Sequence, residues 1–404
     1  MKRILAYLSL DKVGFLEMIL ALYPLLLAYR YGIIILAQVV LLFLDVIVLL
    51  RRKNHIVFFA PLMVFFVYYI LHQFFGIIAW GLTQSYYINS FIGCIIYVSS
   101  IFIIAPNVRF DKLEGSINWV SIICLIGLFY HGLLMLQGGL ITPLKIPFLP
   151  DPDTSQTRVF DEGLRPVSFF MEPQSYVGYM IFTLFYAIRR EKYIWAAIVS
   201  ISFIISTSTT GIAMIPVMFV LYILTGHSKW YRKLLLVVLL VAAAVFLFRS
   251  SIASFGLEKM EETSLSTNIR TVNGPAMAQT MDIGDLFIGV PYANATDYYY
   301  GAGLSQRSAI IPDGQGNVFL PGFWTCLIFY GIFGLILFLA IYYKIWKLDH
   351  DVLPILGCLV VALFTNPDFL GGIWSFQIIY MLVFVKRNIK KPRYESINNN
   401  HAVC

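Results

Sequence analysis

The sequence predicts an all-α fold, a polytopic bundle of about twelve transmembrane helices that forms one domain over residues 1–404. Apolar residues make up 59% of the chain and charged residues only 13%, whereas roughly a quarter of a soluble domain is charged. The apolar residues come in runs close to the ~20 residues that a helix needs to cross a bilayer. Most cations lie between these runs, so the net charge of +7 indicates membrane orientation and a bilayer as partner, not nucleic acid.

Apolar runs between polar breaks are the predicted spans. In chain order they cover 13–29, 32–50, 56–80, 88–105, 117–137, 168–188, 193–206, 211–225, 234–248, 319–343, 352–365 and 372–385. No convincing cleavage site follows the first run, so we expect it to be retained. The seventh and eighth runs are short and separated only by Ser206 to Gly211, which leaves a tilted or partly re-entrant arrangement open.

The distribution of Lys and Arg predicts which ends of the spans face the cytoplasm. With the N-terminus inside, the inner segments hold 21 of the 29 Lys and Arg residues. These segments are 1–12, 51–55, 106–116, 189–192, 226–233, 344–351 and 386–404. Both termini are therefore expected in the cytoplasm, and the two long loops, 138–167 and 249–318, on the outer face.

The two long outer loops are where function is expected, because long ordered loops usually carry it. Four prolines predict an irregular first loop, and the second is expected to begin with a helix near 257–262. The arginines and tyrosines of the second loop are candidates for substrate binding, because guanidinium groups match phosphate oxygens and aromatic rings can pack on sugars. The alternative is that these cations are solvated or contact lipid headgroups. The second loop offers Arg249, Lys259, Arg270, Arg307, Tyr292, Tyr298, Tyr299 and Tyr300.

The sixth span opens with a polar stretch from Arg165 to Tyr176. Glu172 predicts a polar pocket, because an ionisable group at helix depth normally faces a bundle interior or a watery cavity. Arg165 lies seven residues earlier and shares the face of Glu172 if the helix reaches that far. The alternative is that Glu172 pairs with an arginine only to hold the bundle together.

Hydroxyl residues, histidines and known catalytic motifs limit the reactions that the chain is expected to catalyse. The hydroxyls of Ser206 to Thr210 either contact substrate or join membrane helices. None of the six histidines lies in a predicted outer loop, so we expect no histidine-based metal site there; His72 and His131 are expected to be hydrogen-bonded core residues. No phosphate-binding P-loop and no G-x-S-x-G elbow is present, which argues against cytoplasmic ATP hydrolysis.

Residues from about 160 to 340 resemble the O-antigen and capsule polymerases of the Wzy type, within the O-antigen polymerase and ligase superfamily. The stretch Arg165 to Tyr176 is similar to the R-x-x-S-F-F-x-E-P-S signature of that family. The resemblance continues through the run 206–211, Arg270, the segments 286–290 and 317–320, and the glycines Gly331 and Gly334.

This resemblance implies a metal-independent glycosyltransferase in the bacterial cytoplasmic (inner) membrane, with its active site facing the periplasm or exterior. It implies transfer of a growing glycan from undecaprenyl diphosphate to the end sugar of a new lipid-linked repeat unit. Arg165 and Arg270 are then expected to stabilise the leaving diphosphate, and Glu172 to act as general base or to orient an arginine. Residues expected to bind substrate are Arg158, Arg307, Ser168, Ser175, Tyr176, Ser208, Thr210, Tyr299 and Asn317.

Two alternatives remain at this point. A ligase that moves finished glycan shares the donor, but Gly316 stands where many ligase-like members have histidine. A flippase or transporter of lipid-linked sugars belongs to a different class, and such proteins bind substrate near the membrane midplane. A chain-length regulator and a flippase of the same pathway are expected partners. The sugars, the linkage, and the choice among O-antigen, capsule and exopolysaccharide stay open.

Overall fold

A computed structural model of the chain describes residues 13–31, 34–51, 59–80, 85–139, 141–152, 165–225, 269–291, 320–366 and 369–390. The predicted ninth span, 234–248, and the predicted helix near 257–262 lie outside these residues. Within them the fold is all-α, as the sequence predicts, with one short antiparallel pair, β1 (Arg30–Tyr31) and β2 (Ile34–Ile35).

Each of the eleven predicted spans that fall in the described ranges contains a helix. The helices are α2 (Phe15–Leu22), η2 (Tyr23–Ala28), α3 (Leu36–Leu49), α4 (Ala60–Trp80), α5 (Ser85–Ile104), η3 (Ala105–Asn107), α6 (Phe110–Leu136), α7 (Pro173–Arg189), α8 (Tyr193–Ile205), α9 (Thr209–Thr225), α12 (Ile269–Thr280), α13 (Ile283–Ile288), α15 (Gly322–Leu348), η6 (His350–Val352), α16 (Leu353–Thr365) and α17 (Gly372–Lys390).

Two of these helices, α6 and α15, are long and apolar enough to cross a membrane by length and composition. In the other apolar helices, such as α4 and α5, the stretches described with their side chains are shorter, at 10–17 residues. The helix α8, which occupies one of the short predicted spans, has 13 residues. At about 1.5 Å per residue it is roughly 20 Å long, less than the ~30 Å hydrocarbon core of a bilayer.

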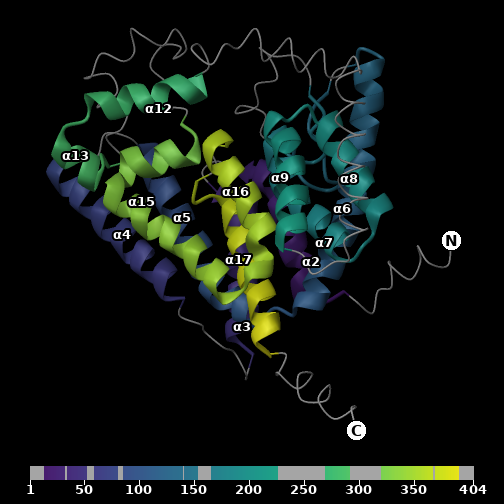
Figure 1. The fold of residues 1–404 in the computed structure, drawn as a ribbon, viewed down its shortest axis with the longest axis horizontal. Helices are drawn as coiled ribbons and strands as arrows, with labels where there is room; N and C mark the ends of the chain where they lie inside the picture. Colours follow the sequence, from purple (N-terminus) through teal and green to yellow (C-terminus); the bar gives the residue numbers. More distant parts are fainter. Residues whose placement is uncertain are drawn as a thin grey trace.

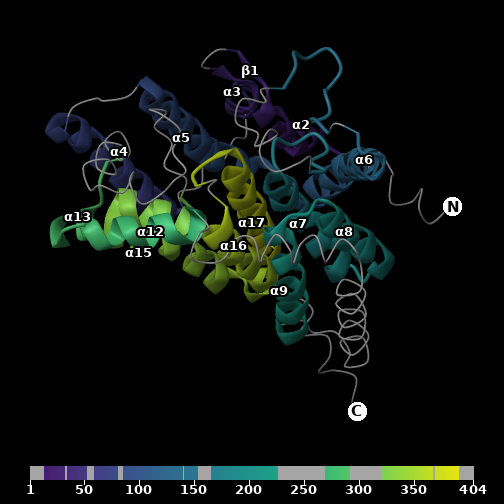
Figure 2. The same ribbon diagram turned by 90° about the horizontal axis from the view of Figure 1, so that it is seen from above.

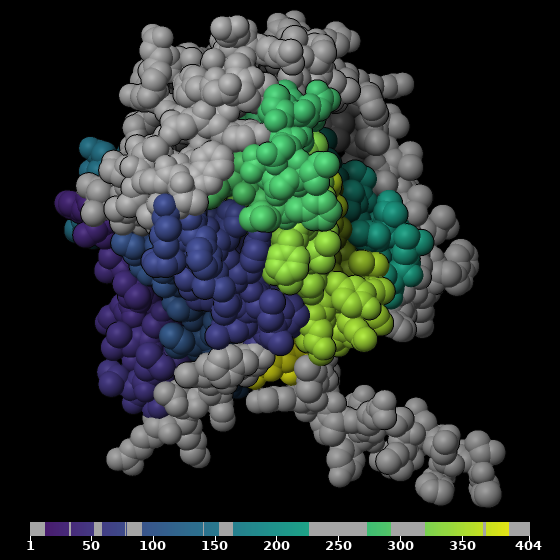
Figure 3. Space-filling model, turned by 90° about the vertical axis from the view of Figure 1, so that its left-hand side faces the viewer, coloured from purple at the N-terminus to yellow at the C-terminus, as the bar shows by residue number. Residues whose placement is uncertain are grey.

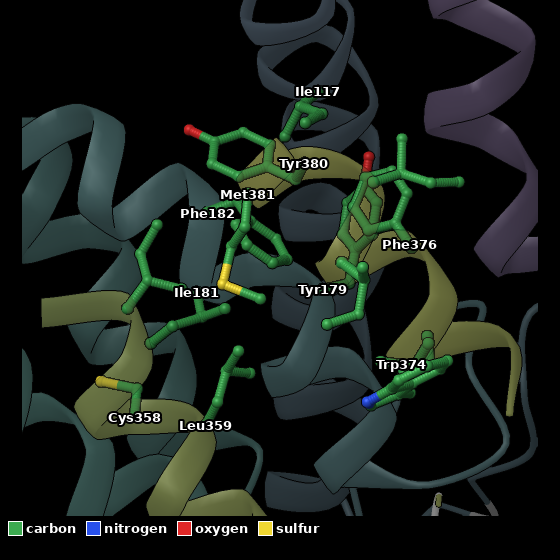
Figure 4. Close-up of a cluster of buried hydrophobic side chains, with 14 of the residues drawn as sticks. Ile117, Tyr179, Ile181, Phe182, Cys358, Leu359, Trp374, Phe376, Tyr380 and Met381 are labelled. Atoms are coloured by element: carbon green, nitrogen blue, oxygen red, sulfur yellow. The ribbon is translucent and has the colours of Figure 1, made fainter. Parts of the chain in front are cut away.

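The helices α7 and α17 lie near the middle of the bundle when it is seen from above (Figure 2). Side chains of α7 are buried on every side from 176 to 185, as expected of a helix surrounded by others. Its aromatic residues pack on those of α17: the ring centroids of Phe182 and Tyr380 are 4.3 Å apart, and those of Tyr179 and Phe376 are 5.3 Å apart (Figure 4). This aromatic packing fixes the position of α7 in the core.

Helix ends meet at one end of the bundle, which we call the basic end. The start of α6, the end of α7 and the last turns of α17 build it. The guanidinium carbon of Arg189 lies 5.2 Å from the ring centroid of Phe110 and 5.1 Å from that of Phe384. Lys386 also donates a hydrogen bond to the carbonyl of Pro106. The last turns of α17 lie at the bottom of Figure 1.

The opposite end, which we call the loop end, holds segments 141–152 and 165–172. The Ile146 N–H donates to the Tyr29 hydroxyl at 2.6 Å, and the Leu144 N–H donates to the Ser168 carbonyl at 2.8 Å. The first long loop is therefore tied both to the N-terminal helices and to the stretch that precedes α7.

The helix α15 is broken at Gly331, which has φ 66° and ψ −177°. The break is filled by the chain that follows α13. The Val290 N–H donates to the Ile328 carbonyl at 2.8 Å, and the Tyr68 hydroxyl donates to the Tyr330 carbonyl at 2.8 Å. These bonds satisfy carbonyls near the helix break, as a helix in an apolar environment requires.

Substituting Gly331 is expected to destabilise the protein strongly. A Cβ at Gly331 would lie 2.2 Å from the Phe287 carbonyl oxygen, and its φ also disfavours L residues. Gly138 is a matched control, because its φ is 70° but nothing lies within 4 Å of its Cβ position. We expect Gly138→Ala to cost about 1 kcal/mol and Gly331→Ala about 4 kcal/mol or more. Thermal unfolding in detergent measures both, and equal shifts would contradict the packing described.

Candidate functional site

The polar stretch at 165–172 is not helical, and α7 begins only at Pro173. Glu172 precedes the helix with an extended backbone, φ −136° and ψ 149°. A proline keeps its preceding residue out of the helical region and fits the first helical position itself. The prediction that the sixth span begins near 168 is therefore wrong, and Arg165 and Glu172 do not share a helical face.

His131 and Ser168 hold this stretch against α6. The Nδ1 atom of buried His131 accepts the N–H groups of Val167 at 3.3 Å and Ser168 at 3.1 Å. Ser168 is fully buried, has a left-handed backbone with φ 57°, and donates its hydroxyl to the Cys124 carbonyl at 2.8 Å. The prediction of a hydrogen-bonded core histidine is confirmed for His131. Its role in anchoring the polar stretch was missed, because sequence alone does not show which backbone it meets.

Glu172 stands where the loop end meets the buried helix α7. Its side chain is half-buried, and its carboxylate accepts a hydrogen bond from the Gln174 side-chain amide. Its carbonyl accepts the N–H groups of Ser175 at 3.1 Å and Tyr176 at 3.2 Å, which starts the helix. The carboxylate thus lies at the loop end, just before the first residue of α7, and not within a helix.

The two predicted catalytic arginines lie on different elements. Arg165 is half-buried at the start of the polar stretch. Arg270 belongs to the first turn of α12, and only its backbone is described. The helix α12 packs against α15, where Gly274 lies so close to Trp324 that a Cβ would be 2.2 Å from the indole ring. Their meeting at one diphosphate stays a prediction. The predicted residues Arg158, Arg307, Tyr299 and Asn317 lie outside the described ranges.

Besides Ser168, three further predicted substrate-binding hydroxyls are buried and bonded within the protein. The Tyr176 hydroxyl donates to Ser202 at 2.8 Å, and the Thr210 hydroxyl donates to Thr365 at 2.8 Å. The Ser208 hydroxyl accepts the backbone N–H of the residue three positions later at 3.3 Å. These bonds correspond to the helix-joining alternative. Contact of these residues, and of half-buried Ser175, with substrate stays a prediction.

The second long loop contains helices α12 and α13, which were not expected from the sequence. Asp282 caps α13 by accepting the Asp285 N–H at 2.8 Å, and Gly289, with φ 92°, ends it. These start and stop signals were present in the sequence. Partial burial, and then the charge of Asp282, raises the pKa of Asp285 above its ordinary value. Both helices pack on α15, and Figure 3 shows them (green) above α15 (yellow-green).

A small crevice lies between α15, α16 and α17. Aromatic and aliphatic side chains line most of it, and Asn366 and Gln377 are its polar residues. None of the predicted site residues lines it. The crevice and the polar stretch are therefore separate features of the described structure.

Comparisons of the chain with protein-family models, with curated proteins and with solved structures give no match. Within the described ranges, no group of three or more His, Cys, Asp or Glu side chains is arranged to hold a metal ion. Function is therefore inferred from the residues, from the resemblance of their pattern, and from the geometry of the loop end.

Proposed function

We propose that the chain is a polytopic protein of about twelve spans in a bacterial cytoplasmic membrane. Large apolar side chains on the outward faces of the helices support this. Phe75 of α4, Ile126 of α6 and Ile336 of α15 are each more than half exposed. Soluble monomers rarely expose large contiguous apolar surfaces, whereas helices that face lipid must.

The proposed orientation puts the basic end in the cytoplasm and the loop end outside. Support comes from three segments that the charge pattern assigns to the cytoplasm, 106–116, 189–192 and 386–404. Described residues of all three meet at the basic end, through Arg189 on Phe110 and through Lys386 on Pro106. Segments assigned to one side by charge alone are thus also neighbours in space.

Two aspartates at opposite ends test this orientation. Asp151 at the loop end has a side chain 87% exposed, and Asp111 at the basic end has one 75% exposed. On a cysteine-free background, a membrane-impermeant thiol reagent should label Asp151→Cys but not Asp111→Cys in cells with a permeabilised outer membrane. After lysis both should react. Labelling of Asp111→Cys alone before lysis would reverse the topology.

We further propose that the chain polymerises lipid-linked glycan units at the loop end. A hydroxyl oxygen of the acceptor's end sugar attacks the anomeric carbon of the donor glycan and forms the new glycosidic bond. The bond from that carbon to the diphosphate oxygen breaks, and undecaprenyl diphosphate leaves with the electron pair. Glu172 takes the hydroxyl proton, and Arg165 and Arg270 stabilise the negative charge that develops on the diphosphate.

The observation that carries this proposal is the position of Glu172. Its carboxylate lies at the loop end, one residue before a helix that is seated in the core. The preceding stretch is fixed by His131 and Ser168. A base held on a rigid support needs little reorganisation during proton transfer. A transporter site would be expected nearer the midplane, so the position favours the enzyme over the flippase.

Deleting the protein tests the proposed reaction against the ligase alternative. Without a polymerase, surface glycan should carry a single repeat unit instead of a ladder of lengths. Without a ligase, attachment to the surface should stop while long chains accumulate on the lipid carrier. Gel analysis of surface and carrier-linked glycan separates these results. Loss of all lipid-linked units from the outer leaflet would instead support the flippase.

A further inference from the structure

Three polar atoms at the basic end are buried and have no hydrogen-bond partner within the described structure. They are Nε of Arg189, Nη1 of Arg387 and the hydroxyl of Tyr380. All three side chains surround one ring: the guanidinium carbons of Arg189 and Arg387 each lie 5.2 Å from the centroid of Phe110, and the Tyr380 ring lies 5.8 Å from it. Three unmet hydrogen-bond donors therefore gather in one place.

Around Phe110, arginine side chains outnumber the carboxylates that are described. Glu114, whose side chain is 3% exposed, accepts hydrogen bonds from both Arg189 and Arg190. Arg387 has no carboxylate within 4.0 Å among the residues that the structure describes, and the next acid, Asp111, is mostly exposed and 4.0 Å from Arg190. Glu114 thus bonds two of the three neighbouring arginines, Arg189 and Arg190. Arg190 is exposed, but the buried Nη1 atom of Arg387 has no hydrogen-bond partner among the described residues, and burying part of a charged group without a partner is costly.

We propose that this cluster binds a phosphate oxyanion, supplied by the headgroup of an anionic phospholipid. Guanidinium groups donate to phosphate oxygens in a matching geometry, and the Tyr380 hydroxyl adds a third donor. The cluster lies between the ends of α6, α7 and α17, and basic pockets between cytoplasmic helix ends suit anionic headgroups. The proposal rests on the membrane placement given above and is independent of the polymerase reaction.

Lipid binding to purified protein tests this site. Protein in neutral detergent is titrated with phosphatidylglycerol, with phosphatidylcholine or with inorganic phosphate, and the thermal midpoint and the bound mass are followed. Phosphatidylglycerol should raise the midpoint and stay bound in native mass spectrometry, whereas phosphatidylcholine should not. Inorganic phosphate that reproduces the full shift would assign the same oxyanion site to free phosphate instead of a lipid.

Arg387→Gln and Arg109→Gln form a matched pair of variants. Arg109 is exposed near the same end, and its backbone N–H donates a hydrogen bond to Glu17 at 3.0 Å. We expect Arg387→Gln to weaken phosphatidylglycerol binding at least about fivefold and Arg109→Gln to change it less than twofold. Equal effects of the two variants would overturn the proposal, because general surface charge would then explain the binding.

Tyr380→Phe covers the case in which Arg387→Gln fails to fold. It removes one donor but keeps the ring that packs on Phe182 and Phe110. It should fold with a midpoint close to wild type in neutral detergent and still lose at least about half of the shift that phosphatidylglycerol gives. An undiminished shift in Tyr380→Phe would place the lipid elsewhere and overturn the site.

Discussion

Glu172→Gln is expected to lower glycan polymerisation by about a hundredfold or more, because general-base catalysis typically contributes ~10² to 10⁴ in rate. Glutamine keeps the shape of the side chain and can still bond Gln174, but it cannot take the proton of the acceptor hydroxyl. Turnover of purified lipid-linked repeat units measures the effect. Asp151→Asn is the control, because Asp151 is an exposed carboxylate at the same end that pairs with Lys145 at 2.8 Å.

The Glu172→Gln result counts only if the variant inserts and folds. Membrane abundance and thermal midpoint should match wild type, since the helix start depends on Pro173 and on the Glu172 backbone, not on its carboxylate. Normal polymerisation at normal abundance would leave Glu172 with a structural role. The base would then be sought at Asp313 or another loop carboxylate.

Arg165→Lys and Arg270→Lys are each expected to remove most of the activity, on the order of a hundredfold, although both keep the positive charge. A lysine cannot donate two parallel hydrogen bonds to a diphosphate as a guanidinium group does. For scale, losing one donor to a developing charge costs about 3 kcal/mol. Turnover is compared with binding of the lipid-linked substrate, so that a loss of positioning is separated from a loss of affinity.

Lys145→Gln is the matched control for the arginines. It removes an exposed cation from the loop end, and we expect near wild-type turnover. Activity of the wild type should also persist in excess EDTA if arginines, rather than a divalent cation, stabilise the diphosphate. Lysine variants that polymerise at wild-type rate, or an activity that EDTA abolishes, would show that this assignment of the catalytic centre is wrong.

Much of the local structure could be predicted from sequence. Long apolar runs predicted where the helices lie, because such a run is itself the main sequence signal of a buried or membrane helix. The start of α7 could also have been derived, because Pro173 excludes a helical Glu172. Likewise, Asp282 and Gly289 signalled the ends of α13. The start of α7 and the ends of α13 could therefore have been predicted, because their signals lie within a few residues of the helix ends.

The sequence by itself determined the all-α class, the sites of most helices, and the concentration of cations in a few short segments. Only the tertiary structure decided that the chain after α13 fills the break in α15 at Gly331 and that His131 holds the polar stretch. It also decided that Arg189 and Arg190 share Glu114, while Arg189 and Arg387 share the ring of Phe110. The physical reason is the sequence separation between the residues that interact. Hydropathy and helix capping act over neighbouring residues, whereas partners such as His131 and Ser168, or Pro106 and Lys386, lie 37 and 280 residues apart. Such pairs meet only when the whole bundle packs.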